Sequence, residues 1–307
     1  MGMKNIFGSK KDKYSTGTIQ PNPTIPQTQS QYTPGMVGAA PVTQAAAAVP
    51  SSPISIGNIH HVGARESQQD SFGISDISNQ MLFTQKGVFG VVADGMGGMT
   101  GGGEASGIAV RTLLQYFNEA LSCEQPQLDL LNMIGAANDN VNRYMEGSQD
   151  NGGSTVVAVI IRDGYLYWIS VGDSRIYLLR GGALIQINRD HTYAVELDEK
   201  AAMGEISWEE AADHPKRVAL TSYLGMGRLE KIDRNIRPVR LQSGDRVILM
   251  SDGVFGTLTD EEMLYGMRQD LHETAAVLQE MILKKEKRGQ DNFTAIIFAY
   301  QKPEGNA

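Results

Sequence analysis

The sequence has few of the features that mark a secreted or membrane protein. Cys123 is the only cysteine among 307 residues, so an internal disulfide is excluded and nothing indicates secretion. The longest aliphatic run, residues 156–161, is far shorter than the roughly 20 residues that span a bilayer. Charged residues at 10–13 interrupt the region where a signal peptide would need an apolar core. We therefore expect a cytoplasmic protein without a membrane span.

Charge is absent from a long stretch near the N-terminus. Residues 14–64 contain no Asp, Glu, Lys or Arg, and most of this stretch is rich in Pro, Gln, Thr, Ser and Ala. Such a composition buries too little apolar surface to offset the entropy of ordering the chain. Residues 1–53 are therefore predicted to be a disordered tail, and residues 54–302 a single folded domain. The basic start of the tail could contact a partner or an anionic surface, but a solubilising extension is the simpler interpretation.

The overall composition also limits the function. The formal net charge of −8 at pH 7 argues against a nucleic-acid-binding protein that works by neutralising phosphates. Hydrophobic residues make up 41% of the chain and charged residues 20%, which is typical of a globular domain. The sequence therefore predicts a folded domain whose partners are not nucleic acids.

The domain is predicted to be rich in strands, with its helices in clusters. Apolar residues recur at helical spacing over 104–121, 127–145, 260–267 and 272–287, and a shorter helix is expected over 207–212. Strands are predicted at 54–62, 87–93, 154–161, 165–171, 175–179, 184–187, 237–241, 246–250 and 293–300. Asp163-Gly164 and Gly181-Gly182 are typical hairpin turns, and the glycines at 101–103 suggest a flexible start to the first long helix. The predicted fold class is α+β, with two stacked antiparallel β-sheets flanked by layers of α-helices.

Aspartates at the edges of strands suggest the chemistry of this domain. Asp94, Asp173 and Asp252 each follow an apolar run, Asp291 precedes one, and Asp70 lies near another edge. A single Asp-Gly is usually a turn, but repeated carboxylates at strand ends favour a shared set of oxygen ligands. Oxygen ligands prefer Mg²⁺ or Mn²⁺ to Zn²⁺. Two such ions roughly 4 Å apart can hold the attacking and leaving oxygens of a phosphoryl transfer.

Several motifs in this order resemble those of the metal-dependent protein phosphatases, the PPM or type 2C family. The motifs are Arg65-Glu66-Ser67-Gln68-Gln69-Asp70, Ala93-Asp94-Gly95-Met96-Gly97-Gly98, Val171-Gly172-Asp173-Ser174-Arg175, Ser251-Asp252-Gly253 and Asp291-Asn292. Residues 190–225 are similar to the flap of bacterial members, and the whole resemblance covers about residues 55–300. It implies the PPM-type phosphatase fold for residues 54–302.

The resemblance also implies a role for each acidic residue of the motifs. Asp94 would bridge two metal ions, and the carbonyl oxygen of Gly95 would be a further ligand of one of them. Asp252 and Asp291 would complete the second metal site. Asp70 would hold the first metal directly or through water. Asp173 corresponds to a residue that helps to bind a weaker third ion, so the implied cofactors are two tightly bound Mn²⁺ or Mg²⁺ ions plus a weaker third.

The implied catalysis combines these metals with Arg65. Its guanidinium offers a planar fork to two phosphate oxygens, so Arg65 would grip the substrate phosphate. A water that bridges the metals would attack phosphorus without a protein–phosphate intermediate. Met96 stands where animal members often have His, so the group that protonates the leaving group is left open.

The predicted function is metal-dependent hydrolysis of phosphoserine and phosphothreonine in proteins, opposing a bacterial Ser/Thr kinase. The expected partners are phosphorylated proteins, including that kinase, and we expect a monomer. The alternative is a regulatory module that binds phosphoproteins on the same fold with weak turnover. The complete set of aspartates favours an enzyme.

Overall fold

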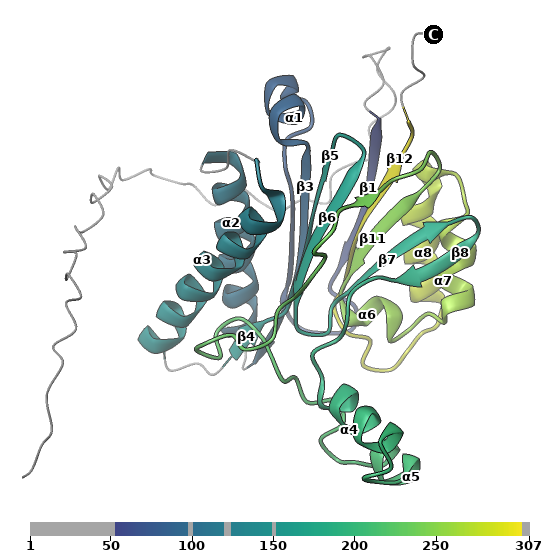
Figure 1. Cartoon of the computed structure of the whole chain (residues 1–307). Helices are drawn as coiled ribbons and strands as arrows, with labels where there is room; N and C mark the ends of the chain where they lie inside the picture. Colours follow the sequence, from purple (N-terminus) through teal and green to yellow (C-terminus); the bar gives the residue numbers. More distant parts are fainter. Residues whose placement is uncertain (1–52, 98–100, 120–123, 149–151, 303–307) are drawn as a thin grey trace, which may run out of the picture. The chain divides into compact units, whose positions relative to one another are not determined.

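The computed structural model describes residues 53–97, 101–119, 124–148 and 152–302, most of the predicted domain (Figure 1). The predicted disordered tail at residues 1–53 lies outside these ranges except for Pro53, so that prediction stays untested. Within the described ranges, no helix combines the length and the apolar character needed to cross a membrane.

Two antiparallel sheets form the centre of the domain. The five-stranded sheet has the order β1 (Ile54–His61), β12 (Phe293–Tyr300), β11 (Arg246–Met250), β7 (Arg175–Arg180) and β8 (Ala183–Gln186). The seven-stranded sheet has the order β10 (Val239–Arg240), β6 (Tyr165–Val171), β5 (Val156–Arg162), β3 (Val88–Gly97) and β2 (Asp70–Ile74), with β4 (Gly152–Ser154) on β3 and β9 (Asp233–Arg234) on β6. All named strand pairs are antiparallel, which confirms the prediction.

Helices cover the outer faces of both sheets (Figure 1). The helices are α1 (Gln80–Lys86), α2 (Gly101–Glu119), α3 (Pro126–Gly147), α4 (Tyr193–Ala202), α5 (Trp208–Ala212), α6 (Asp252–Phe255), α7 (Asp260–Met267) and α8 (Leu271–Lys284). The pair α2 and α3 lies on the seven-stranded sheet, and α7 and α8 lie on the five-stranded sheet. The helices α4 and α5 form a separate lobe with its own small core.

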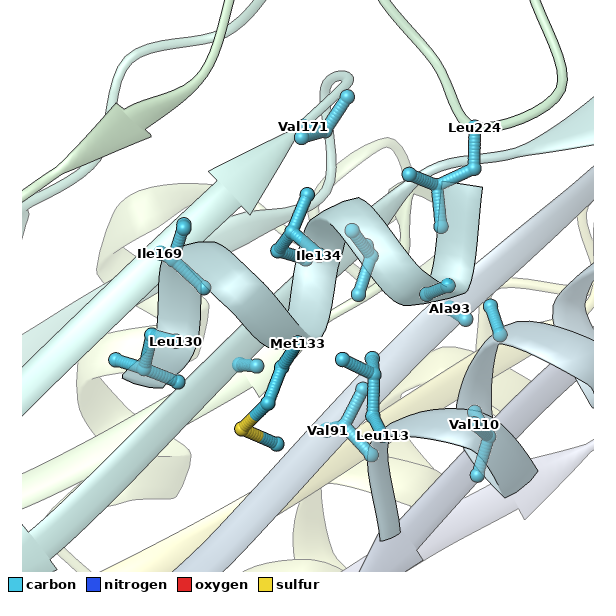
Figure 2. Packing of buried hydrophobic residues seen from close by; sticks show 14 of the residues in the cluster. Val91, Ala93, Val110, Leu113, Leu130, Met133, Ile134, Ile169, Val171 and Leu224 are labelled. Atoms are coloured by element: carbon cyan, nitrogen blue, oxygen red, sulfur yellow. The ribbon is translucent and has the colours of Figure 1, made fainter. Parts of the chain in front are cut away.

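Three hydrophobic clusters hold these layers together. One lies between α2, α3 and the seven-stranded sheet, where Leu113 and Met133 meet Val91 and Ile169 (Figure 2). The second fills the space between the two sheets, and the third joins the five-stranded sheet to α7 and α8. The order of layers is therefore helix, sheet, sheet, helix, as the predicted PPM-type fold requires.

The structure corrects the predicted boundaries around the glycines. The glycines at 101–103 form the first turn of α2, so the helix begins before its predicted start at residue 104. Gly102 allows a close approach to β3, because a Cβ on it would lie 2.9 Å from the backbone carbon of Gly95. Strand β3 also continues past its predicted end to Gly97, because residues 95–97 pair with β4. Asp94 therefore lies within a strand and not at its end.

The registers bring the motif residues to one end of the two sheets. In the five-stranded sheet, His61 at the end of β1 is opposite Phe293, and Met250 at the end of β11 is opposite Arg175. In the other sheet, Asp70 at the start of β2 is opposite Asp94. The chain passes from one sheet to the other at this same end, between β1 and β2 and between β6 and β7. The segments that carry Arg65 and Asp173 are these two crossings.

The first core cluster provides a test of the layered packing. Leu113 is fully buried between α2 and the seven-stranded sheet, whereas Leu128 on α3 is 48% exposed. We expect Leu113→Ala to lower the free energy of unfolding by about 2–5 kcal/mol, because a cavity adds to the lost apolar burial. The matched control Leu128→Ala should change it by less than about 1 kcal/mol. Equal effects of the two substitutions in urea unfolding would contradict this packing.

Candidate active site

Asp70 is the most deeply buried carboxylate of the motifs. It is 4% exposed, and its Oδ2 accepts a hydrogen bond of 2.7 Å from the Ser251 hydroxyl. Its Oδ1 is buried without a hydrogen-bond partner among the described residues. An unpartnered carboxylate oxygen in a buried position is costly in free energy, so this atom is a natural ligand for a cation.

The backbone around Asp94 is held firmly from both sides. The Asp94 amide donates to the Thr155 hydroxyl at 3.2 Å, and the Asp94 carbonyl accepts from the Thr155 amide at 2.9 Å. The Gly95 amide donates to the Gln69 carbonyl at 3.1 Å. A Cβ on Gly95 would lie 2.1 Å from the carbonyl oxygen of Gly102, so only glycine allows α2 to begin this close to β3.

The other three aspartates come from loops and helix starts at the same end. Asp173 lies in the crossing after β6, Asp252 is the first residue of α6, and Asp291 lies just before β12. Asp94, Asp173 and Asp252 line a cavity of about 520 Å³. Asp173, Asp252, Asp291 and Arg65 line an adjoining cavity of about 620 Å³. The structure thus gathers around this end every residue that the sequence singled out for the site.

Burial and mutual repulsion disfavour the charged form of these carboxylates. Burial, followed by the charges of Asp252 and Asp291, raises the pKa of Asp70 to about 6. Burial raises the pKa of Asp94 well above its ordinary value, and four neighbouring aspartates, Asp70 foremost, raise it further. The pKa of Asp173 is raised to about 6 by burial and then by Asp252. Like charges held together in a partly buried cleft are typical of a functional site.

The donor set fits hard divalent cations. The available ligand atoms are carboxylate and carbonyl oxygens, which suit Mg²⁺ and Mn²⁺, and a cation would relieve the repulsion that raises the pKa values. In the described ranges, no three acidic, histidine or cysteine side chains already form a closed cage.

Arg65 lies at the open side of this cluster. Its Nη2 donates to Oδ2 of Asp291 at 2.7 Å, and the two side chains are 55% and 42% exposed. Such an exposed ion pair contributes little to stability. The ion pair instead orients Arg65, because Asp291 holds one edge of the guanidinium while the rest of the group stays accessible to a ligand.

Asn292 is a site residue whose importance the sequence did not reveal. Its Oδ1 accepts from the Gln69 amide at 2.7 Å, and its Nδ2 donates to the carbonyls of Val62 and Ser67 at 2.8 and 3.1 Å. These bonds fasten the crossing that carries Arg65 to the start of β12. The only sequence signal was its position directly after Asp291.

Arg175 and His191 connect neighbouring parts of the site. Arg175 forms a two-pronged ion pair with Asp190, and its guanidinium carbon lies 4.0 Å from the centroid of the Phe255 ring. His191 holds the preceding crossing, because its Nδ1 accepts from the Gly172 amide at 3.1 Å. These contacts join the start of the flap to the segment that bears Asp173.

The raised pKa values predict how the metal-free protein responds to pH. In the folded state, Asp70 and Asp173 each have a pKa of about 6, so they keep their protons until the pH approaches that value. In the unfolded chain their pKa is near 3.8, and the protons are released at lower pH. Stability is therefore lost as the pH rises through about 6. We expect chelator-treated protein to have a lower Tm at pH 7.5 than at pH 5, and Asp70→Asn to reduce that difference.

The control for this measurement is Asp139→Asn on the exposed side of α3. It should leave the difference in Tm between the two pH values as in the wild type. If Asp70→Asn and Asp139→Asn show the same pH dependence as the wild type, Asp70 does not carry the raised pKa.

Comparison with known proteins agrees with the geometry. The family profile described as Protein phosphatase 2C matches residues 59–287. The serine/threonine phosphatase stp of Listeria monocytogenes serotype 4b is 34% identical over 214 residues, which are 67% of this chain and 82% of that protein.

Two solved structures extend this likeness to three dimensions. The PPM Ser-Thr phosphatase MsPP of Mycobacterium smegmatis, solved with cacodylate, is 28% identical with a TM-score of 0.64 over 80% of this chain and 98% of that one. The catalytic domain of the phosphatase PstP, solved with two manganese ions, is 25% identical with a TM-score of 0.65 over 81% of this chain and 99% of that one. With this fold, this carboxylate cluster and a profile match over most of its length, the chain belongs to the protein phosphatase 2C family and is a serine/threonine phosphatase.

Proposed function

We propose that this phosphatase removes phosphate from phosphoserine and phosphothreonine in proteins at the cavity lined by Asp94, Asp173 and Asp252. The observation that carries the proposal is Oδ1 of Asp70, which is buried without a hydrogen-bond partner among the described residues. Asp70 lies directly across the strand pair from Asp94. The carboxylates around this atom repel one another when they are ionised. Bound cations would offset that repulsion and keep them in the charged form.

Each carboxylate has a proposed role toward the metal ions. Asp94 is the residue that would bridge two tightly bound Mn²⁺ or Mg²⁺ ions, with the Gly95 carbonyl and Asp70 on the first. Asp252 and Asp291 would complete the second. Asp173 would help to hold a weaker third ion. When bound, the ions would acidify a bridging water that attacks phosphorus and would neutralise charge on the phosphate.

The protein's own contribution is to position the substrate. Arg65 would bind two phosphate oxygens with the part of its guanidinium that Asp291 leaves free. Asn292 would keep the Arg65 segment in place through its three hydrogen bonds. Met96 carries no proton that it can donate, so water is the proposed proton donor to the leaving hydroxyl.

The proposed partners follow from this reaction. The substrates would be phosphoproteins made by a bacterial Ser/Thr kinase in the cytoplasm, including the kinase itself, and the phosphatase would act as a monomer. The relatives are named as serine/threonine phosphatases, which supports this class of substrate.

The bridging role of Asp94 is tested by removing its charge. We expect Asp94→Asn to lower kcat for a phosphothreonine peptide with Mn²⁺ by more than about tenfold, a rise in the barrier of over roughly 1.4 kcal/mol. Asp139→Asn on the exposed face of α3 is the control and should keep the wild-type rate. Excess chelator should abolish hydrolysis by the wild type and by Asp139→Asn. If Asp94→Asn stays within tenfold of the wild type, or turnover survives chelation, the proposed mechanism is wrong.

The role of Arg65 is tested by separating binding from chemistry. We expect Arg65→Ala to raise KM for phosphopeptides by about tenfold with a smaller change in kcat, because the arginine binds the phosphate in ground and transition states alike. Arg111→Ala removes an exposed arginine on α2 and should change neither constant. An unaltered KM in Arg65→Ala would remove this residue from the phosphate site.

A further inference from the structure

One wall of the catalytic cavity is apolar. The cavity of about 520 Å³ has Asp94, Asp173 and Asp252 on its charged side. The remaining large side chains that line it are Met96, Val218, Leu220 and Tyr223, which we call the apolar shelf. Pockets that combine a few polar groups with an apolar lining are typical ligand sites.

One part of the shelf lies at the end of β3, where this strand pairs with β4. Met96 on β3 pairs with Gly153 on β4. The Tyr223 ring lies against Gly153, since a Cβ at that glycine would come within 2.5 Å of Tyr223 Cδ2. The missing side chain at Gly153 therefore makes room for the ring, and a larger residue there would displace it.

The segment that carries the shelf is anchored at both ends. Leu224 exchanges two backbone hydrogen bonds with Ser154, of 2.8 and 3.0 Å, and its side chain is buried in the first core cluster (Figure 2). At the other end, Leu220 forms a bridge with Thr192 at the start of the flap. These anchors hold Leu220 and Tyr223 in place, so this part of the shelf is suited to selecting a ligand.

Val218 is the most exposed residue of the apolar shelf. It is 82% exposed and lines both the catalytic cavity and the adjoining one. Exposed apolar residues are common singly, but this one lines the same cavity as the three other residues of the shelf. The adjoining cavity differs in character, because its lining includes Arg65, Arg175 and Lys287.

We propose that the apolar shelf binds an apolar side chain next to the phosphorylated residue of the substrate. The proposal rests on the proposed function, which places the phosphate at the carboxylates in the same cavity. Peptides with a residue such as leucine beside the phosphothreonine would then be preferred over peptides with a polar residue of similar size. The phosphatase would select a class of phosphoprotein sequence and not phosphothreonine alone.

The experiment compares phosphothreonine peptides in pairs. The two peptides of a pair differ only by Leu or Gln at one position, and the positions varied are the two before and the two after the phosphothreonine. We expect one position at which Leu in place of Gln raises kcat/KM about tenfold. Most of this change should be a lower KM, because the apolar contact is made in the ground state and the transition state alike. Val218→Asp and Tyr223→Ser should each bring the Leu-to-Gln ratio close to one. Ile236→Asp is the matched control, because Ile236 is also 82% exposed but lies outside both cavities.

The outcomes separate this inference from the proposed function. Equal rates for every Leu and Gln peptide in the wild type, or a ratio that persists in both shelf variants, would overturn the shelf alone. A loss of the ratio in Ile236→Asp as well would also overturn it. Failure of the proposed function would appear instead as hydrolysis that does not need Asp94 or Mn²⁺. If Tyr223→Ser unfolds, Val218→Asp decides, since so exposed a side chain supports little of the fold.

Discussion

Repulsion among buried carboxylates is the constraint on which this end of the molecule depends. Asp70 and Asp94 face each other across β2 and β3, and Asp173, Asp252 and Asp291 add their charges to the field at Asp94. Folding brings these groups together at a cost in free energy that bound protons or cations offset. The packing of the two sheets and their helices supplies the free energy of folding that offsets this cost. The stability of the site therefore depends on the hydrophobic core.

The sheets decide which residues meet at the cluster. Since the strands are antiparallel and in register, the ends of β1 and β11 and the starts of β7 and β12 lie together. The crossing between β1 and β2 and the crossing between β6 and β7 also occur at this end, and they carry Arg65 and Asp173. Glycines complete the geometry, because Gly95 lets the start of α2 approach β3 and Gly153 makes room for Tyr223. The position of the site is therefore a consequence of topology.

Sequence predicts the parts of this design that depend on local pattern. The strands at 165–171, 246–250 and 293–300 have their predicted bounds, because long apolar runs and glycine turns fix them locally. The strand β2 and helices α1 and α4 were missed, since short half-buried elements carry a weak periodicity. Within the site, the aspartates were visible as motifs. The role of Asn292 was not, because its partners lie more than 220 residues away in sequence.

Titration of chelator-treated protein with Mn²⁺ in a calorimeter would show whether the carboxylate cluster holds a pair of metal ions. We expect two tight sites and a weaker third. More protons should be released on binding at pH 6 than at pH 7.5, because cations displace protons from carboxylates whose pKa values are raised. Asp94→Asn should lose tight binding of the pair. Binding of fewer than two ions by the wild type, or an unchanged pair in Asp94→Asn, would contradict the claim that the carboxylate cluster is a two-metal site.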